Sequence, residues 1–174
     1  MRSGNSNYWD YIENYWFLIN YNVTHIRHSE LKASIIITAY GVVFGLAYDV
    51  GSSLMIADKY KYIFYSLLGG FVVCAITSMI FSFRTFIPRI NVKLRKSVFF
   101  FNDAKYHFKS AKKYTKSLRE TMLNDKDLVE LLGEQAYVNG VIAAEKYANI
   151  SKAIKFMMYS VFTAIAAILT EFIL

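Results

Sequence analysis

The sequence predicts an all-α membrane protein: a transmembrane helical hairpin, a cytosolic helical hairpin and a third, C-terminal membrane helix. Three observations predict this class. Hydrophobic residues make up 55% of the 174 residues and charged residues only 19%, below the roughly 25% of ordinary soluble domains. Residues 62–83 form a run of 22 without a charge or a proline. The chain contains a single proline, so its long apolar segments are free to be helical.

Residues 1–28 are predicted to form an aromatic, amphipathic helix. Apolar side chains recur there at three- and four-residue steps, which gives one apolar helical face. They are Trp9, Ile12, Trp16, Ile19, Val23 and Ile26. Two interpretations remain open: this helix lies in the headgroup layer, where aromatic rings are favoured, or it packs against the later helices.

The transmembrane hairpin is predicted over residues 29–84. Its first span is the uncharged run 33–48, extended by tilting to a helix from near Glu30 to near Val50. Its second span is the run 62–83, because about 1.5 Å per residue carries 22 residues across the roughly 30 Å hydrocarbon core. A soluble helix is rarely apolar on every face, which favours a span here.

Small residues recur at four-residue steps in both predicted spans. They are Gly41 and Gly45 in the first span, and Ser66, Gly70 and Cys74 in the second. Such steps let another helix backbone approach closely. We interpret these five residues as helix-packing positions, either inside the hairpin or between subunits.

Residues 84–126 are strongly basic. They contain twelve Lys or Arg and three acidic residues, a net charge of +9. The positive-inside rule places this segment, and with it the N-terminus, in the cytoplasm. Attraction to anionic lipids explains most of the charge. A second interpretation is capture of a nucleotide, with arginine forks on phosphate and tyrosines stacking on a base. The candidate ligands are Arg84, Arg89, Arg95 and Lys96.

The cytosolic helical hairpin is predicted over residues 85–152. Asn102 or Asp103 is suited to cap its first helix, 104–123, and the pair 124–125 marks a turn before the second. The second helix carries a stripe at roughly heptad spacing that is expected to pack on the first. Its members are Leu128, Leu131, Gln135, Val138, Ile142, Asn149 and Ala153.

The second cytosolic helix is expected to continue straight into the C-terminal membrane helix, 153–174. Residues 156–170 are an uncharged run of 15, short for a span but long enough when extended at both ends. Lys152 and Lys155 would then anchor its cytoplasmic end.

No pattern in the sequence indicates an enzyme. There is no nucleophile elbow, no phosphate-cradling loop and no dinucleotide fingerprint. His25 and His28 are spaced i, i+3, but two interfacial histidines explain them better than a metal site does. We therefore expect no catalysis, no cofactor and no metal.

Three stretches, taken together and in order, resemble the membrane effectors of Pycsar antiphage systems. HSELKASIIITAYGVVFGL is similar to the start of that family, FFFNDAK to its Phe-Phe-x-(Asp/Asn) element, and GEQAYVNGVIAAEKYANISKAIKF to its signature before the last apolar helix. The resemblance covers about residues 25–174. The matching positions are Glu30, Lys32, Ala33, Phe100, Asn102, Asp103, Gln135, Tyr137, Lys146 and Tyr147. Glu30 stands where the family pattern has Asp.

The resemblance implies an effector in the bacterial inner membrane that stays dormant until a cyclase encoded nearby makes cyclic CMP or cyclic UMP. The effector, as an oligomeric pore, then impairs membrane integrity and kills the infected cell. Two alternatives remain open. One is a SLATT-like channel held shut by a nucleic-acid oligomer, its partner gene encoding a nucleotidyltransferase. The other is a scaffold that recruits a partner through its cytosolic helices.

The resemblance also suggests a mechanism for Lys32 and Lys146. Both could approach the cytoplasmic mouth of the spans and pair there with Glu30 or Asp103. Breaking such pairs on ligand binding would bias a closed assembly toward an open one.

Overall fold

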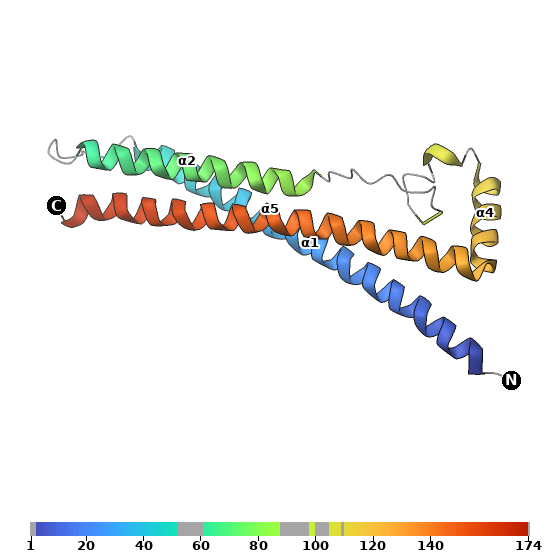
Figure 1. The fold of residues 1–174 in the computed structure, drawn as a ribbon. Coiled ribbons are helices and arrows are strands. Elements are labelled where there is room, and N and C mark those ends of the chain that lie inside the picture. Colours follow the sequence, from blue (N-terminus) through green and yellow to red (C-terminus); the bar gives the residue numbers. More distant parts are fainter. Residues whose placement is uncertain (1–2, 52–60, 88–97, 100–104, 109, 174) are drawn as a thin grey trace. The chain divides into compact units, whose positions relative to one another are not determined.

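The structure is a computed structural model that describes residues 3–51, 61–87, 98–99, 105–108 and 110–173. The described chain is built from α1 (Ser3–Gly51), α2 (Lys61–Phe86), α4 (Ala111–Leu123) and α5 (Asp125–Ile173), and contains no strand (Figure 1). Helices α1, α2 and α5 are each long and apolar enough to cross a membrane. The predicted class, an all-α membrane protein with three spans, is confirmed.

The chain divides into two compact units. Unit 1 comprises residues 1–26 and 89–144, and unit 2 comprises residues 27–88 and 145–174. Both α1 and α5 contribute residues to each unit. The predicted N-terminal segment therefore shares a unit with the basic segment, and the predicted third span shares a unit with the transmembrane hairpin.

Unit 2 is a three-helix bundle of α1, α2 and α5. Its core cluster combines small residues with a few larger ones: Ala33, Ile36, Tyr40, Ala75, Ile150 and Ala153. Three of these are alanines with no exposed surface. Small side chains at such contacts allow the helix backbones to approach closely, as is typical of helices that pack in a membrane.

Contacts along unit 2 fix the direction of each helix. Ser78 of α2 donates a hydrogen bond to the carbonyl of Ala153 in α5, at 2.8 Å. A Cβ at Gly70, earlier in α2, would lie 3.7 Å from Cγ2 of Thr163, later in α5. Helices α2 and α5 are therefore antiparallel. Since α1 and α2 form the hairpin, α1 runs parallel to α5.

Unit 1 is centred on a contact between the start of α1 and the start of α5. Its core cluster is Ile12, Ile19, Leu128, Leu132 and Ala136. In the structure the N-terminal segment packs against α5, which is the second of the two interpretations given above. Trp9, Tyr11, Phe17 and Tyr21 lie outside this core and are exposed.

α4 buries no side chain and begins later than the sequence indicated. Its N-cap is Ser110, whose hydroxyl accepts a hydrogen bond from the Lys113 N–H at 3.3 Å. A serine hydroxyl satisfies an orphan donor at a helix start, so the helix begins at Ala111. The predicted single helix over 104–123 is wrong in its continuity: residues 105–107 are helical, but residue 108 is not, and α4 starts only at Ala111. The predicted caps, Asn102 and Asp103, lie outside the described residues. The next prediction is confirmed: Asn124 forms the turn, and its side-chain oxygen accepts from the Asp127 N–H at 3.5 Å.

Two further expectations differ from the structure. The helix that contains the first span does not begin near Glu30, because α1 runs unbroken from Ser3. No proline or glycine lies between residues 5 and 40 to break it. The stripe on α5 is confirmed in part, since four of its predicted members are buried: Leu128, Leu131, Val138 and Ala153. Leu132 and Ala136 contact α1 in the core, whereas the predicted Gln135 is only half-buried. The expectation that α5 runs straight into the third span is confirmed.

Candidate functional site

A buried lysine joins all three helices of unit 2. The Nζ atom of Lys146 in α5 donates to Oε1 of Glu30 in α1 at 2.5 Å and to the carbonyl oxygen of Thr85 in α2 at 2.7 Å. The lysine side chain is 5% exposed and the glutamate side chain 39% exposed. We call these three residues the lysine node.

The position of Lys146 explains why it needs partners. It occupies the buried stripe of α5, three residues after Ala143 and four before Ile150, where an apolar residue is usual. An unpaired ammonium there would lose its hydration without compensation. Glu30 supplies the opposite charge, and its side chain remains partly exposed.

Thr85 contributes through its place in the helix. It is the penultimate residue of α2, so its carbonyl is one of the last four that lack an intrahelical partner. An ammonium group at a helix C-terminus satisfies such a carbonyl and interacts favourably with the helix dipole. The lysine node is therefore both an ion pair and a cap on α2.

The end of α2 also brings together the candidate ligand Arg84 and the predicted membrane anchor Lys152. The Arg84 guanidinium carbon lies 5.5 Å from the centroid of the Phe81 ring, and Nζ of Lys152 lies 5.4 Å from the same centroid. Both distances are within the range of a cation–π interaction. A cationic side chain from the end of α2 and one from the start of the C-terminal span thus meet at the same ring.

Buried hydroxyls continue from the lysine node along the bundle. Ser78 bonds to α5, and the hydroxyls of Tyr40 and Ser160 lie 2.8 Å apart, joining α1 to α5. Ser82 is also buried, and its hydroxyl has no partner among the described residues. Hydrogen bonds of this kind hold helices together where burial of apolar surface gains little.

The structure brings together few of the predicted ligand or gating residues. Glu30 and Lys146 meet, which is one of the pairings that the sequence left open. Lys32 is exposed, and Arg84 lies over Phe81. In unit 1, Gln135 donates to the Asn139 side chain at 3.3 Å.

The remaining candidates are exposed or lie outside the described chain. Tyr137 and Tyr147 are 63% and 61% exposed. Five candidates, and the matching Phe100, lie outside the described residues: Arg89, Arg95, Lys96, Asn102 and Asp103.

The predicted packing residues behave differently from one another. Gly70 faces α5 closely, as described above. Gly41 and Gly45 are exposed, and a Cβ at either would meet nothing within 4 Å. Ser66 is exposed and Cys74 is half-buried. Of the three predicted glycines, only Gly70 faces another helix closely in the described chain. Gly133 and Gly140 of α5, which were not among the predicted packing residues, also face α1.

Sequence reasoning missed Thr85 and the buried hydroxyls. A signal was present: the buried residues of α2 from Phe71 onward follow alternating four- and three-residue steps. They are Phe71, Ala75, Ser78, Ser82 and Thr85. This spacing marks a helix seam. In an apolar span, serines and threonines on one seam indicate hydrogen bonds to a neighbouring helix.

Comparison with known proteins places this geometry in a family. The sequence matches the Pycsar effector protein domain, PycTM, over residues 14–172. The chain belongs to the Pycsar effector family. The match includes the lysine node and most of all three candidate spans. No curated protein and no solved structure matches the chain.

Family membership gives the chain an antiphage effector role, and its three candidate spans make it a membrane protein. The lysine node lies at the end of those spans that carries Arg84 and Lys152. Because both bonds start from the same cation, a displacement of α5 breaks both, whereas a displacement of α1 or α2 breaks one of them.

Proposed function

We propose that this Pycsar effector is switched on by a cyclic nucleotide, cyclic CMP or cyclic UMP by resemblance, and then permeabilises the bacterial inner membrane as a homo-oligomer. The outcome would be death of the infected cell. The observation that carries the proposal is the family match over residues 14–172. The nucleotide would come from a cyclase encoded nearby, and the protein itself would catalyse no reaction.

The packing of unit 2 supports an oligomer. Its centre is filled, since Ala33, Ala75, Ser78 and Ala153 have no exposed surface. One copy therefore encloses no aqueous path. Conduction requires several copies, or a rearrangement that opens the bundle.

The basic segment supports recognition of an anion. In its described part, Lys112, Lys113, Lys116 and Arg119 are exposed on α4. Cations grouped on one short helix raise the local concentration of phosphate ligands. We place the segment on the cytoplasmic side, following the positive-inside rule, where the signal would be made.

We propose that the lysine node stabilises the closed state. Its bonds join α1, α2 and α5, and any opening that separates these helices must break them. A ligand that favours the open state shifts the equilibrium by its differential affinity alone. Weakening the node should therefore lower the ligand concentration needed for opening.

The test is release of a trapped dye from proteoliposomes that contain the purified chain. Our proposal predicts release on adding cyclic CMP or cyclic UMP, and no release with 5′-CMP or 5′-UMP. Release only after an oligonucleotide is removed would instead support the SLATT-like alternative. No release under any condition would support the scaffold.

A paired variant tests the node itself. Lys146→Met keeps the length of the side chain and removes its charge, and we expect dye release at lower nucleotide concentration. Lys155→Met removes an exposed lysine nine residues along the same helix and serves as the control. Lys32→Glu reverses the charge of the other lysine that the family pattern selects. An unchanged nucleotide response in Lys146→Met would contradict the gating role of the node, and an unchanged response in Lys32→Glu would contradict a role for Lys32.

A further inference from the structure

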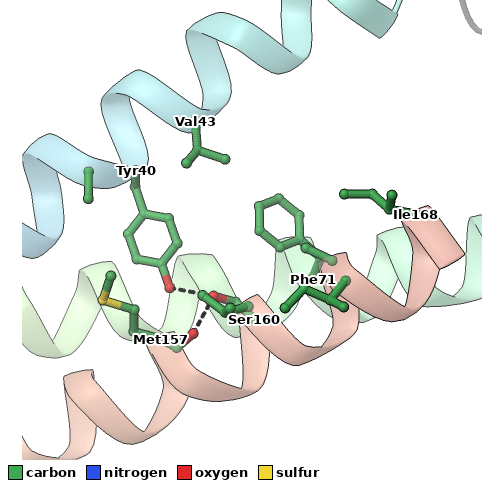
Figure 2. Close-up of a pocket in the computed structure, with 10 residues that line it drawn as sticks. Tyr40, Val43, Phe71, Met157, Ser160 and Ile168 are labelled. Carbon is green, nitrogen blue, oxygen red and sulfur yellow. Dashed lines mark hydrogen bonds between the residues drawn. The ribbon is translucent and has the colours of Figure 1, made fainter.

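An apolar groove lies in unit 2 where α1, α2 and α5 meet (Figure 2). It has a volume of about 150 Å³. Tyr40 and Val43 line it from α1, Phe71 from α2, and Ser160 and Ile168 from α5. All five residues belong to unit 2.

The polar atoms of the groove are already satisfied. Ser160 donates its hydroxyl proton to the carbonyl of Met157 at 2.8 Å, so the 2.8 Å bond to Tyr40 uses the tyrosine proton. Figure 2 shows both bonds at the floor of the groove. No hydroxyl proton remains for a polar ligand. An apolar space of roughly this size stays dry and accepts apolar guests.

The groove is open along one side. Val43, Val161, Ile165 and Ile168, all in its lining, are 43%, 47%, 48% and 56% exposed. These residues lie inside helices that qualify as membrane spans. In a bilayer the open side faces hydrocarbon rather than water, so a nucleotide has neither the route nor the hydrogen-bond partners to occupy it.

The length of the groove matches one leaflet. Its lining on α5 begins at Met157 and ends at Ile168, which at about 1.5 Å per residue is roughly 16 Å, half of a roughly 30 Å hydrocarbon core. We propose that this groove is a lipid site, occupied by one acyl chain of a membrane phospholipid lying along α5 against Tyr40 and Phe71.

The surface of α1 favours lipid over a second copy as the occupant. The groove side of α1 presents Ala39, Tyr40 and Val43, whereas the two glycines, Gly41 and Gly45, lie on its opposite side, because residues two apart on a helix differ by about 200°. Close contacts between membrane helices use small residues. A subunit contact through the glycines would leave the groove facing lipid.

The test uses a tryptophan reporter and phospholipids with brominated acyl chains, which quench tryptophan on contact. Trp9 and Trp16 are first replaced by phenylalanine. Phe71→Trp then reports on the groove. Phe64→Trp is the matched control: Phe71 and Phe64 are both buried, at 9% and 8% exposure, and lie seven residues apart on the same face of α2, but Phe64 does not line the groove.

We expect stronger maximal quenching of the Phe71→Trp reporter than of the Phe64→Trp reporter, compared over a series of lipids brominated at different depths. Adding Ala164→Leu, which fills the groove, should remove the excess. Ala166→Leu adds the same volume two residues away, outside the lining of the groove, and should leave the excess quenching unchanged. Equal quenching of the two reporters would overturn the proposal. So would quenching that rises as the protein is diluted in lipid, since a second copy would then be the occupant.

A second measurement does not depend on the reporters folding. Mass spectrometry of the otherwise unaltered chain, released from detergent, counts the phospholipids that stay bound. The wild-type chain should retain one more phospholipid per copy than Ala164→Leu, and Ala166→Leu should match the wild type. Equal retention in all three would contradict the site. Neither measurement uses a nucleotide, so its result is independent of the proposed activation.

Discussion

Units 1 and 2 bury different side chains along the same two long helices. The core of unit 1 is mainly aliphatic, with Ile12, Ile19, Leu128 and Leu132. The core of unit 2 contains alanines and an unusual number of buried polar groups, including Ser78, Ser160 and Lys146. The backbone and the helix type do not differ, so the difference lies in what holds the helices together.

The surrounding solvent explains this difference. In water, burying leucine and isoleucine stabilises a helix contact by removing apolar surface from the solvent. In lipid the surroundings are as apolar as leucine, so helices associate through close packing and hydrogen bonds. The core of unit 1 is typical of helices packed in water, and that of unit 2 is typical of helices packed in a membrane.

The largest expected effect separates the two cores directly. Leu132→Ala removes a fully buried side chain from unit 1 and should lower the free energy of unfolding by about 3 kcal/mol, from lost transfer energy and a cavity. Ile150→Ala, at 1% exposure in unit 2, should cost less, because hydrocarbon solvates the unfolded helix. Hydrogen exchange in detergent micelles measures both. Equal losses would remove the distinction between the cores.

The next effect is that of the lysine node. Lys146→Met should cost about 2–3 kcal/mol, somewhat below the roughly 3–5 kcal/mol typical of a broken buried pair, because Glu30 is partly exposed and can reach water. The double variant Lys146→Met/Glu30→Leu should recover part of this loss. Unfolding by SDS, followed by circular dichroism, gives the coupling between the two positions. A double variant as unstable as the sum of the single variants would show that the two residues act separately.

A smaller effect distinguishes two buried serines on α2. Ser78→Ala removes the hydrogen bond to the Ala153 carbonyl and should cost about 0.6 kcal/mol, the average for such bonds between membrane helices. Ser82→Ala removes a buried hydroxyl that has no partner among the described residues. It should be neutral or slightly stabilising. The same SDS titration compares them, and a larger loss in Ser82→Ala would contradict the assigned hydrogen bonds.

The smallest effect on the fold is expected at Gly41 and Gly45. A Cβ at either meets nothing within 4 Å, so the double replacement by alanine should not destabilise the monomer and should favour the helix slightly. A change in cross-linked oligomer size in membranes would place these glycines in a subunit contact. An unchanged distribution would leave oligomer assembly to other faces.

The sequence predicted the membrane architecture well because hydrophobicity and charge act locally. Three spans, the continuous α5 and the turn at Asn124 all follow from local patterns. The helix that contains the first span was expected to start near Glu30 but starts at Ser3, because a span boundary leaves no mark inside a continuous helix. The helix predicted over 104–123 is interrupted after residue 107, and Ser110 supplies a new N-cap for α4.

The candidate site was predictable only in part. Glu30 and Lys146 were selected by resemblance and are brought together. The seam spacing could have marked Thr85 as buried, but not as a partner of Lys146, because it contributes a backbone oxygen rather than a side chain. The helix that the start of α5 packs against was also predicted wrongly: the core contact is with α1, not with the helix before α5. Leu132 and Ala136 contact α1 because two apolar stripes lie side by side on α5, and single-sequence periodicity does not choose between them.

The lysine node also has a consequence for biosynthesis. Lys146 follows Glu30 by 116 residues and Thr85 by 61, so the ribosome completes both partners long before the lysine emerges. The nascent hairpin therefore forms before the lysine that later bonds its glutamate and the carbonyl of Thr85. The late arrival of α5 completes the bundle, so an interrupted translation product would lack the bonds that join the three long helices.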